Sequence, residues 1–229
     1  MNILIAPDSF KHSLSARMVA ENLKQGLLSS EPSWNIACHP MADGGEGTVD
    51  VILEALGGET IKKTVSGPLL DPVEASYGIL SDKKTAIIEM ASASGLELLN
   101  QEELDPWLTT TYGTGELISD AMEKGCTKII IGLGGSATND GGTGMVRALG
   151  AEFLDDEGEE VKHGGGYLGE IHSIILNNLD RRIQNCEIIA ATDVKNTLIG
   201  DTGASMVYAP QKGANTLMAE KLDRYMVRY

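Results

Sequence analysis

The sequence predicts an α/β protein built in two parts, a parallel β-α-β-α start and a second part with a mixed sheet. Three observations support this prediction. Apolar, β-branched runs alternate with helical segments up to residue 56. From residue 59, three strand-like runs follow one another with no helix between them, and alternation resumes after Gly115. We therefore expect residues 1–58 to start one domain and residues 59–229 to form a second.

The first part begins with a buried strand and an amphipathic helix. Ser13 or Ser15 is placed to cap this helix, because a serine oxygen can accept the free N–H groups of a first turn. Val19, Leu23 and Leu27 recur with helical spacing. The expected elements are a strand at residues 2–6, a helix through 19–27, a strand at 34–39 and a helix at 49–56.

The second part opens with strands separated by the turns Gly67-Pro68 and Ser81-Asp82. Strands that follow one another without a helix predict local antiparallel pairing. The acidic segment 155–160 and the glycine run 164–166 are expected to be solvated turns. The expected elements are strands at 60–65, 73–80 and 85–90, a helix at 115–124, a strand at 127–133, a helix ending at 149, strands at 187–191 and 206–209, and a helix at 217–227.

A glycine-rich segment, residues 134–142, lies between an expected strand and an expected helix. Gly134 and Gly135 leave backbone N–H groups free to face a ligand, and Asn139 or Asp140 can cap the helix that follows. A strand, a glycine loop and a helix N-terminus together predict an anion site. The alternative is a tight turn that only needs small residues.

A second glycine-rich loop, residues 41–48, carries two carboxylates. Asp43 precedes Gly44-Gly45, so its side chain can project where the backbone is open. A carboxylate there can bind Mg²⁺ or accept a proton from a substrate hydroxyl. The alternative for Asp43 and Glu46 is that they cap the following helix.

Polar residues also follow other expected strands, where open α/β sheets bind ligands. Ser9 and Lys11 can hold a carboxylate or phosphate, unless they are only a turn serine and a solvated lysine. Asp193 and Lys195 suit a base or metal ligand beside a cation for phosphate. Their alternative is a salt-bridged turn.

Three further positions have the same setting. Ser92 and Ser94 follow the strand that ends near Glu89. A carboxylate at the end of an apolar run needs a partner or a metal, unless the strand has already reached solvent there. Lys212 lies beside a glycine, after an expected strand and before an expected helix.

The composition excludes several classes of protein. A formal net charge of −15 argues against nucleic-acid and anionic-membrane partners, and 4% aromatic residues supply few stacking platforms. Cys38, Cys126 and Cys186 have no CxxC spacing, which is typical of core thiols in a reducing cytosol. Histidines show no zinc motif, and we expect neither a signal peptide nor a membrane span. These observations predict a cytoplasmic protein.

Five motifs appear in order along the chain: IAPDSFK at residues 5–11, ADGGEGT at 42–48, GGSATNDGG at 134–142, DVKN at 193–196 and PQKGA at 210–214. With these motifs the chain closely resembles the bacterial type I glycerate kinase family over essentially its whole length. The resemblance implies ATP-dependent phosphorylation of a glycerate hydroxyl. It also implies two domains, a flavodoxin-like one split by a mixed-sheet α/β domain that has been likened to restriction enzymes.

With this resemblance, the loops receive expected roles in phosphoryl transfer, which needs positioning and charge neutralisation. ATP and Mg²⁺ are the expected cofactors, glycerate is the expected substrate, and a homo-oligomer is left open. The two glycine-rich loops could exchange roles. The nucleotide-binding residues are expected to be Gly134, Gly135, Ser136, Asn139, Asp140 and Gly141. The catalytic residues are expected to be Asp43, Asp193, Lys195 and Lys212, with Asp43 and Asp193 as metal ligands. The substrate-binding residues are expected to be Ser9, Lys11, Glu46, Ser92 and Ser94.

The chain departs from the family in length. Family members are considerably longer, and here the sequence ends in an expected helix, so we expect an incomplete flavodoxin-like sheet with an exposed edge. Thr197 stands where proline is expected, and Ala209 where glycine is more usual. Two rival interpretations remain, a fragment that binds nucleotide or glycerate without turnover and another sugar-phosphate or nucleotide enzyme. No GxGxxG follows the first strand, which argues against a dinucleotide site.

Overall fold

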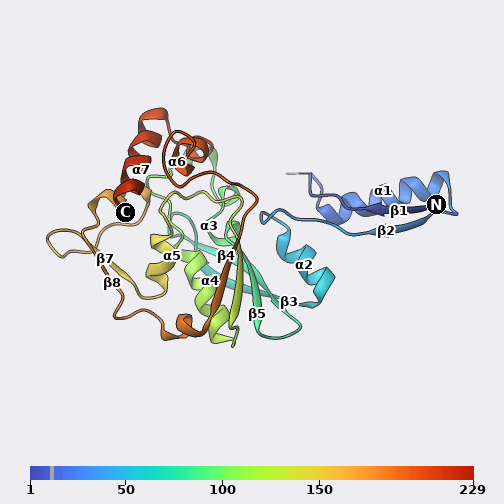
Figure 1. The fold of residues 1–229 in the computed structure, drawn as a ribbon, viewed down its shortest axis with the longest axis horizontal. Helices are drawn as coiled ribbons and strands as arrows, with labels where there is room; N and C mark the ends of the chain where they lie inside the picture. Colours follow the sequence, from blue (N-terminus) through green and yellow to red (C-terminus); the bar gives the residue numbers. More distant parts are fainter. Residues whose placement is uncertain (11–12) are drawn as a thin grey trace.

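The computed structural model describes residues 1–10 and 13–229 and has an α/β fold with a parallel two-stranded sheet and a mixed five-stranded sheet. An elongated N-terminal arm extends from a larger body that contains the five-stranded sheet (Figure 1). The two-part α/β fold expected from the sequence is confirmed. Lys11 lies outside the described residues.

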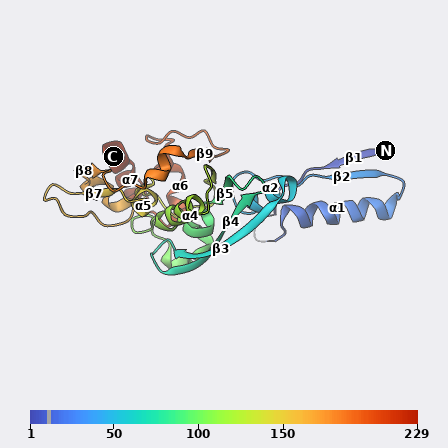
Figure 2. The ribbon, with the colours of Figure 1, turned by 90° about the horizontal axis from the view of Figure 1, so that it is seen from below.

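The arm consists of β1 (Asn2–Ile5), α1 (Ala16–Ser30) and β2 (Asn35–Cys38), with the two strands paired in parallel. Figure 2 shows α1 running beside this narrow sheet, away from the body. Ser15 caps α1, because its Oγ accepts the N–H of Met18 at 3.3 Å. The arm leaves apolar side chains in solvent, with Leu4 65% and Leu23 50% exposed.

The five-stranded sheet has the order β3-β4-β5-β6-β9. The first three strands are antiparallel neighbours, while β5, β6 and β9 are parallel. This mixture explains why the sequence shows consecutive strands first and alternating strands and helices later. The strands are β3 (Gly58–Ser66), β4 (Pro72–Leu80), β5 (Thr85–Glu89), β6 (Lys128–Gly132) and β9 (Glu187–Ala191).

The main core lies between this sheet and α4 (Tyr112–Glu123). Leu117 and Ile118 of α4 are fully buried and belong to the same cluster as Ile88 and Ile129 of the sheet. Truncating one of these side chains to alanine would cost about 2–5 kcal/mol of stability. Two shorter helices, α3 (Ala91–Ser94) and α5 (Thr143–Ala148), follow β5 and β6.

Helix α2 (Thr48–Leu56) packs on the five-stranded sheet, since Val49 clusters with Leu80 and Ile87. The division between residues 1–58 and 59–229 stays a prediction. By its packing contacts α2 belongs to the body, so the arm ends before residue 48.

The predicted strand at residues 206–209 is wrong. Residues Ala204–Tyr208 form helix α6, and the N–H of Val207 donates to the carbonyl of Gly203 at 3.0 Å. A four-residue apolar run carries no usable period, so the sequence could not separate strand from helix here. The helix expected at 217–227 is confirmed as α7 (Thr216–Arg228).

The glycine run at residues 164–166 is buried, so the predicted solvated turn is wrong there. The N–H of Gly166 donates to the carbonyl of Trp107 at 3.0 Å, and a Cβ atom at Gly165 would lie 2.6 Å from the carbonyl oxygen of Asn139. These glycines permit close packing. The acidic segment is largely exposed as expected, and it follows the first strand of an unpredicted antiparallel pair, β7 (Glu152–Leu154) and β8 (Ser173–Ile175).

Short 3-10 turns lie at Leu96–Leu98, Gln101–Glu103, Gly165–Glu170, Arg181–Asn185 and Pro210–Lys212. No helix in the described part of the chain combines the length and apolarity that a bilayer crossing requires.

Candidate active site

The parallel half of the large sheet brings three strand ends into line. Glu89 of β5 pairs with Gly132 of β6, which pairs with Ala191 of β9. The loops that follow these strands therefore leave the sheet at the same edge, where open α/β sheets bind ligands. The Ser92, glycine-rich and Asp193 segments expected to carry chemistry all begin there.

The loop between β2 and α2 crosses this edge. The carbonyl oxygen of Gly44 accepts the N–H of Gly134 at 3.3 Å. A Cβ atom at Gly132 would collide with that same carbonyl, and one at Gly134 would lie 2.8 Å from the Cα of Gly45. Only glycine allows the two loops to approach this closely, so the glycines of both motifs build one contact.

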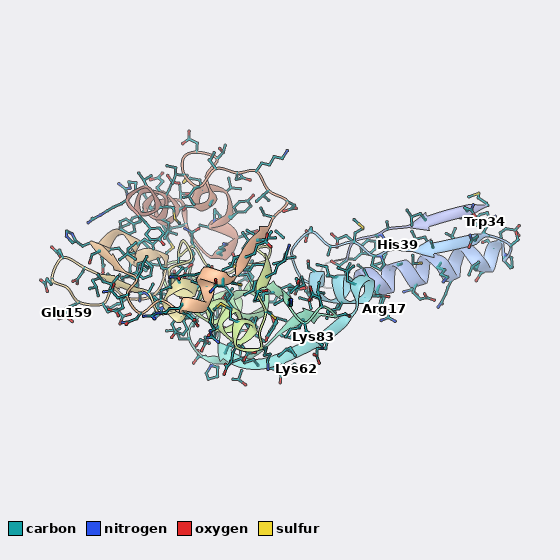
Figure 3. All side chains as sticks on the ribbon, turned by 60° about the horizontal axis from the view of Figure 1, so that its bottom comes forward. Arg17, Trp34, His39, Lys62, Lys83 and Glu159 are labelled. Carbon is teal, nitrogen blue, oxygen red and sulfur yellow. The ribbon has the colours of Figure 1, made fainter. Side chains whose placement is uncertain are left out.

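A groove of about 860 Å³ opens beside this contact, between the start of α1, helix α2 and the edge of β3 and β4. It is lined by Ser9 and Arg17 from the arm and by Glu46 and Glu89 from the body. Arg17 carries the one positive charge among the described residues of its lining. Figure 3 shows Arg17 where the arm meets the body. The structure thus brings the predicted residues Ser9 and Glu46 to one groove.

Glu89 has the partner that its position demands. Its Oε1 accepts the N–H of Val49 at 2.7 Å, so the end of β5 holds the first turn of α2. Burial raises the pKa of Glu89, while the N–H groups of Val49 and Gly47 act in the opposite direction. The sequence signal, a carboxylate ending an apolar run, was correct in demanding a partner.

The first residues of the glycine-rich loop offer free donors. Gly135 and Ser136 are not buried, and their N–H groups meet no acceptor among residues 1–10 and 13–229. Gly135 has φ +74°, a conformation that favours glycine. The carbonyl of Gly135 is used by the N–H of Leu96 at 2.9 Å, which holds the loop against the segment after β5. This arrangement suits an anion.

Lys212 also contacts this loop, through its side-chain ammonium group. Its Nζ donates to Ser136 Oγ at 2.9 Å and to the carbonyl of Thr138 at 2.5 Å. Burial lowers the pKa of Lys212 to about 8, although the carboxylate of Asp140 acts in the opposite direction. The ammonium group therefore fixes the conformation of the loop, while the expected catalytic role of Lys212 stays a prediction.

Asp140 is buried, and both oxygens of its carboxylate accept hydrogen bonds from the protein. Its Oδ2 accepts the N–H of Thr111 at 2.8 Å and that of Gly144 at 3.2 Å, and its Oδ1 accepts the N–H of Gly142 at 3.1 Å. It thus joins the starts of α4 and α5, although the N-cap of α5 is Gly142 and not Asn139 or Asp140 as expected. These contacts leave it no free face for a nucleotide.

The other predicted nucleotide residues differ in access. Asn139 is buried and donates through Nδ2 to Ser205 Oγ at 3.0 Å. Gly141 is exposed, with the ring of Tyr229 next to it. Access to solvent therefore favours Gly134, Gly135 and Ser136 as the ligand-facing part of the motif.

Ser92 and Ser94 are engaged within the protein. Ser92 Oγ accepts the N–H of Ser76 at 2.8 Å, and Ser94 Oγ lies 2.8 Å from Thr114 Oγ1 in the fully buried interior. Their expected substrate contact is contradicted for Ser94, because a side chain with no exposed surface cannot reach a ligand.

Asp43 and Asp193 lie on the two loops that meet at Gly44 and Ala191, where a Cβ atom on Gly44 would be 3.0 Å from the Ala191 oxygen. Both aspartates are exposed, as is Lys195. Asp43 Oδ1 accepts the N–H of Gly45 at 2.8 Å, which leaves its second oxygen for a ligand. No group of three or more His, Cys, Asp or Glu side chains in the described part of the chain could hold a metal. Two carboxylates fit Mg²⁺, which usually takes one or two from the protein and completes its shell with water and phosphate.

Sequence reasoning gave no role to Arg17 or to Thr48, whose Oγ1 accepts the N–H of Gly44 at 3.2 Å. Arg17 could have been found from its place in the first turn of the helix after the Ser9 loop. Thr48 carried the signal of a hydroxyl directly after a glycine-rich loop.

The chain is similar to known proteins over nearly its whole length. The model of the glycerate kinase family matches residues 3–229. Glycerate 2-kinase of Escherichia coli K12 is 51% identical over 229 residues, and glycerate kinase of Bacillus subtilis 168 is 49% identical over 224 residues. The matches cover 100% and 98% of this chain and 60% and 59% of those proteins.

A crystal structure described as glycerate kinase 2 from Salmonella typhimurium LT2 superposes with a TM-score of 0.88 at 49% identity. It matches 100% of this chain and 61% of the solved one. The chain thus spans about 60% of the length of the relatives it matches. With a family model covering nearly every residue and relatives at about half identity, the chain belongs to the glycerate kinase family.

Proposed function

We propose that this chain forms the core of an ATP-dependent glycerate kinase, which transfers the γ-phosphoryl group of ATP to a hydroxyl of D-glycerate. The observation that carries the proposal is the contact of the two glycine-rich loops above the aligned ends of β5, β6 and β9. Because of this contact, unpaired backbone N–H groups, the carboxylates of the two loops and the groove lie next to one another. Family membership supports the same reaction.

The phosphate tail of ATP is proposed to rest on the loop that begins at Gly134. The free N–H groups of Gly135 and Ser136 donate to phosphate oxygens, and Lys212 fixes the loop through Ser136 and Thr138. Preorganised donors of this kind stabilise developing charge without reorganising during the reaction. Lys195, exposed after β9, supplies the mobile positive charge.

Asp43 and Asp193 share two roles, proton acceptor for the glycerate hydroxyl and ligand for Mg²⁺. A bound Mg²⁺ would neutralise phosphate charge and orient the transferred group. The carboxylate at the base position holds the hydroxyl and removes its proton as the new P–O bond forms. Their loops touch at Gly44 and Ala191, which supports a joint site.

The groove is the proposed place of glycerate. Ser9, Arg17 and Lys11 are assigned to its carboxylate, and Glu46 to a hydroxyl. Arginine suits a carboxylate because its planar fork can donate two parallel hydrogen bonds. The name of the Escherichia coli relative supports transfer to the C2 hydroxyl, which would give 2-phosphoglycerate.

The direct test combines turnover with binding. ADP release is measured with MgATP and D-glycerate, and ³¹P NMR identifies which hydroxyl carries the product phosphate. Thermal-shift titrations with each substrate run in parallel, because a ligand that binds the native state raises its melting temperature. Binding of both substrates without ADP release would assign the chain to ligand binding alone. Absence of both would refute the proposal.

A cytoplasmic location is proposed from the three thiols, which are free, since disulfides are rare in that compartment. Cell fractionation followed by immunoblotting tests it.

A further inference from the structure

A second cavity lies away from the groove, beside the antiparallel pair β7 and β8. It has a volume of about 510 Å³, and Tyr112, Arg147, His163 and Asn178 contribute to its walls. It shares no lining residue with the groove among the described residues. Figure 3 shows Glu159, on the loop that supplies one wall, at the end of the molecule opposite Trp34 of the arm.

Arg147 is a buried cation whose hydrogen-bonding capacity is unfilled. Its side chain is 5% exposed, and its Nε meets no acceptor within residues 1–10 and 13–229. Its nearest ion-pair partner is Glu160, with 3.8 Å between Nη1 and Oε1, which is too long for a hydrogen bond. The guanidinium carbon lies 5.2 Å from the ring centroid of Phe153. A buried guanidinium with an empty donor is costly unless something else accepts from it.

The other walls suit a polar ligand. The ring of His163 meets Tyr112 edge-on at a centroid distance of 5.4 Å, and its Nδ1 lies 3.4 Å from Thr110 Oγ1. Glu152 is engaged by Asn178, whose Nδ2 donates to its Oε1 at 2.8 Å. Glu160 has a side chain 63% exposed, so it is hydrated and can leave the guanidinium.

We propose that this cavity binds a small organic anion whose carboxylate or phosphate group accepts hydrogen bonds from Arg147, displacing Glu160. Arginine forms its strongest hydrogen bonds with these groups, and burial strengthens them by excluding water. The volume lies within the range of small-molecule sites. Its occupant would touch α5, the helix whose first turn is held by Asp140 of the glycine-rich segment.

The test observes Arg147 directly. In a ¹⁵N-edited NMR spectrum of the 229-residue chain, the Nε–H signal of Arg147 is followed during separate titrations with inorganic phosphate and with acetate. Sodium chloride at matched ionic strength is the reference. We expect a saturable shift of this signal with at least one anion, while the signals of Arg181, Arg182, Arg224 and Arg228, which line neither the groove nor this cavity, do not saturate. The more effective anion identifies the ligand class. A signal that does not saturate with either anion would overturn the proposal.

Two matched pairs of variants separate this site from general charge effects. E160Q removes the competing carboxylate and should tighten binding several-fold, whereas E159Q on the same loop changes net charge equally and should leave affinity unchanged.

R147K keeps the positive charge but loses the planar fork of donors, and should weaken binding by about 10-fold or more. R182K, an exposed arginine outside the cavity, is its control. The variant titrations are read from the Tyr112 and His163 ring signals. Equal effects of E160Q and E159Q would contradict the proposal, and this pair needs no change in the buried interior.

Discussion

Lys212 Nζ lies 2.9 Å from Ser136 Oγ and joins two motifs that are 76 residues apart in the sequence. The lysine was expected to face phosphate, but it lies under the loop that offers the donors. A buried ammonium that satisfies a hydroxyl and a carbonyl fixes the loop before any ligand arrives. In the proposed phosphate site, Lys212 would therefore hold the donors in place without contacting the ligand.

The first prediction concerns pH and Lys212. Its folded pKa of about 8 lies below the ordinary value of 10.5, so the unfolded chain binds more protons between these two values. The free energy of unfolding of the wild type should therefore rise with pH across this window, relative to Lys212→Met.

Affinity for MgATP should fall as pH rises through about 8, because the neutral amine loses its charge-assisted hydrogen bonds to the loop. Urea unfolding and calorimetric titration at several pH values measure both. Parallel pH profiles for the two proteins would contradict the assignment.

Asp140→Asn should lower the free energy of unfolding by about 2–3 kcal/mol, because hydrogen bonds to a buried carboxylate are strong and an amide places a donor against donors. Urea denaturation monitored by circular dichroism measures the change. Asp156→Asn, on the exposed acidic loop, should change stability by less than about 0.5 kcal/mol. Equal effects would show that Asp140 is not the junction of α4 and α5.

Gly132→Ala should destabilise the protein by about 1–3 kcal/mol, since the added methyl group collides with the carbonyl of Gly44. Gly26→Ala is the matched control. Gly26 lies inside α1 with nothing within 4 Å of the added Cβ, so alanine should stabilise the helix there by about 0.5–1 kcal/mol. Thermal unfolding of both variants checks the opposite signs, and a neutral Gly132→Ala would argue against the loop contact.

Asp193→Asn should reduce turnover by about 10²-fold or more, because the amide can neither accept the hydroxyl proton nor bind Mg²⁺ well. The coupled ADP assay measures it. Asp201→Asn, exposed on the same connection after β9, should retain normal turnover. A near-normal rate for Asp193→Asn would leave Asp43 as the base.

Arg17→Gln should raise KM for D-glycerate by about 10-fold with a smaller effect on kcat, since a hydrogen bond from a charged group to the substrate carboxylate is lost. Arg181→Gln is the control, because that exposed arginine does not line the groove. Steady-state kinetics over a range of glycerate concentrations decide the case. An unchanged KM would move carboxylate binding to Ser9 and Lys11.

The sequence was informative where the chemistry is local. Apolar β-branched runs such as Ile129–Ile131 predicted strands correctly. Of the two glycines expected to have free N–H groups, Gly135 meets no acceptor among the described residues, whereas the N–H of Gly134 donates to the carbonyl of Gly44. The short run at 206–209 was misjudged, because so few residues fit either period.

Long-range packing could not be predicted. The buried carboxylate of Asp140 accepts a hydrogen bond from the N–H of Thr111, and the buried ammonium of Lys212 donates to the carbonyl of Thr138. In each pair the partner comes from another segment of the chain. Gly164, Gly165 and Gly166 have the composition of a solvated turn, yet they are small because Gly164 and Gly166 lie against Trp107 and Gly165 lies against the carbonyl of Asn139. Single-sequence patterns report which residues can face a ligand, but they do not report which donors the protein itself has already filled.

The groove is lined from both pieces of the molecule, by Ser9 and Arg17 of the arm and by Glu46 and Glu89 of the body. Its width is therefore governed by the angle at which the two pieces meet. A substrate that contacts both walls would fix the angle between the arm and the body. Without it, a tilt of the arm would widen or narrow the space around the reacting hydroxyl.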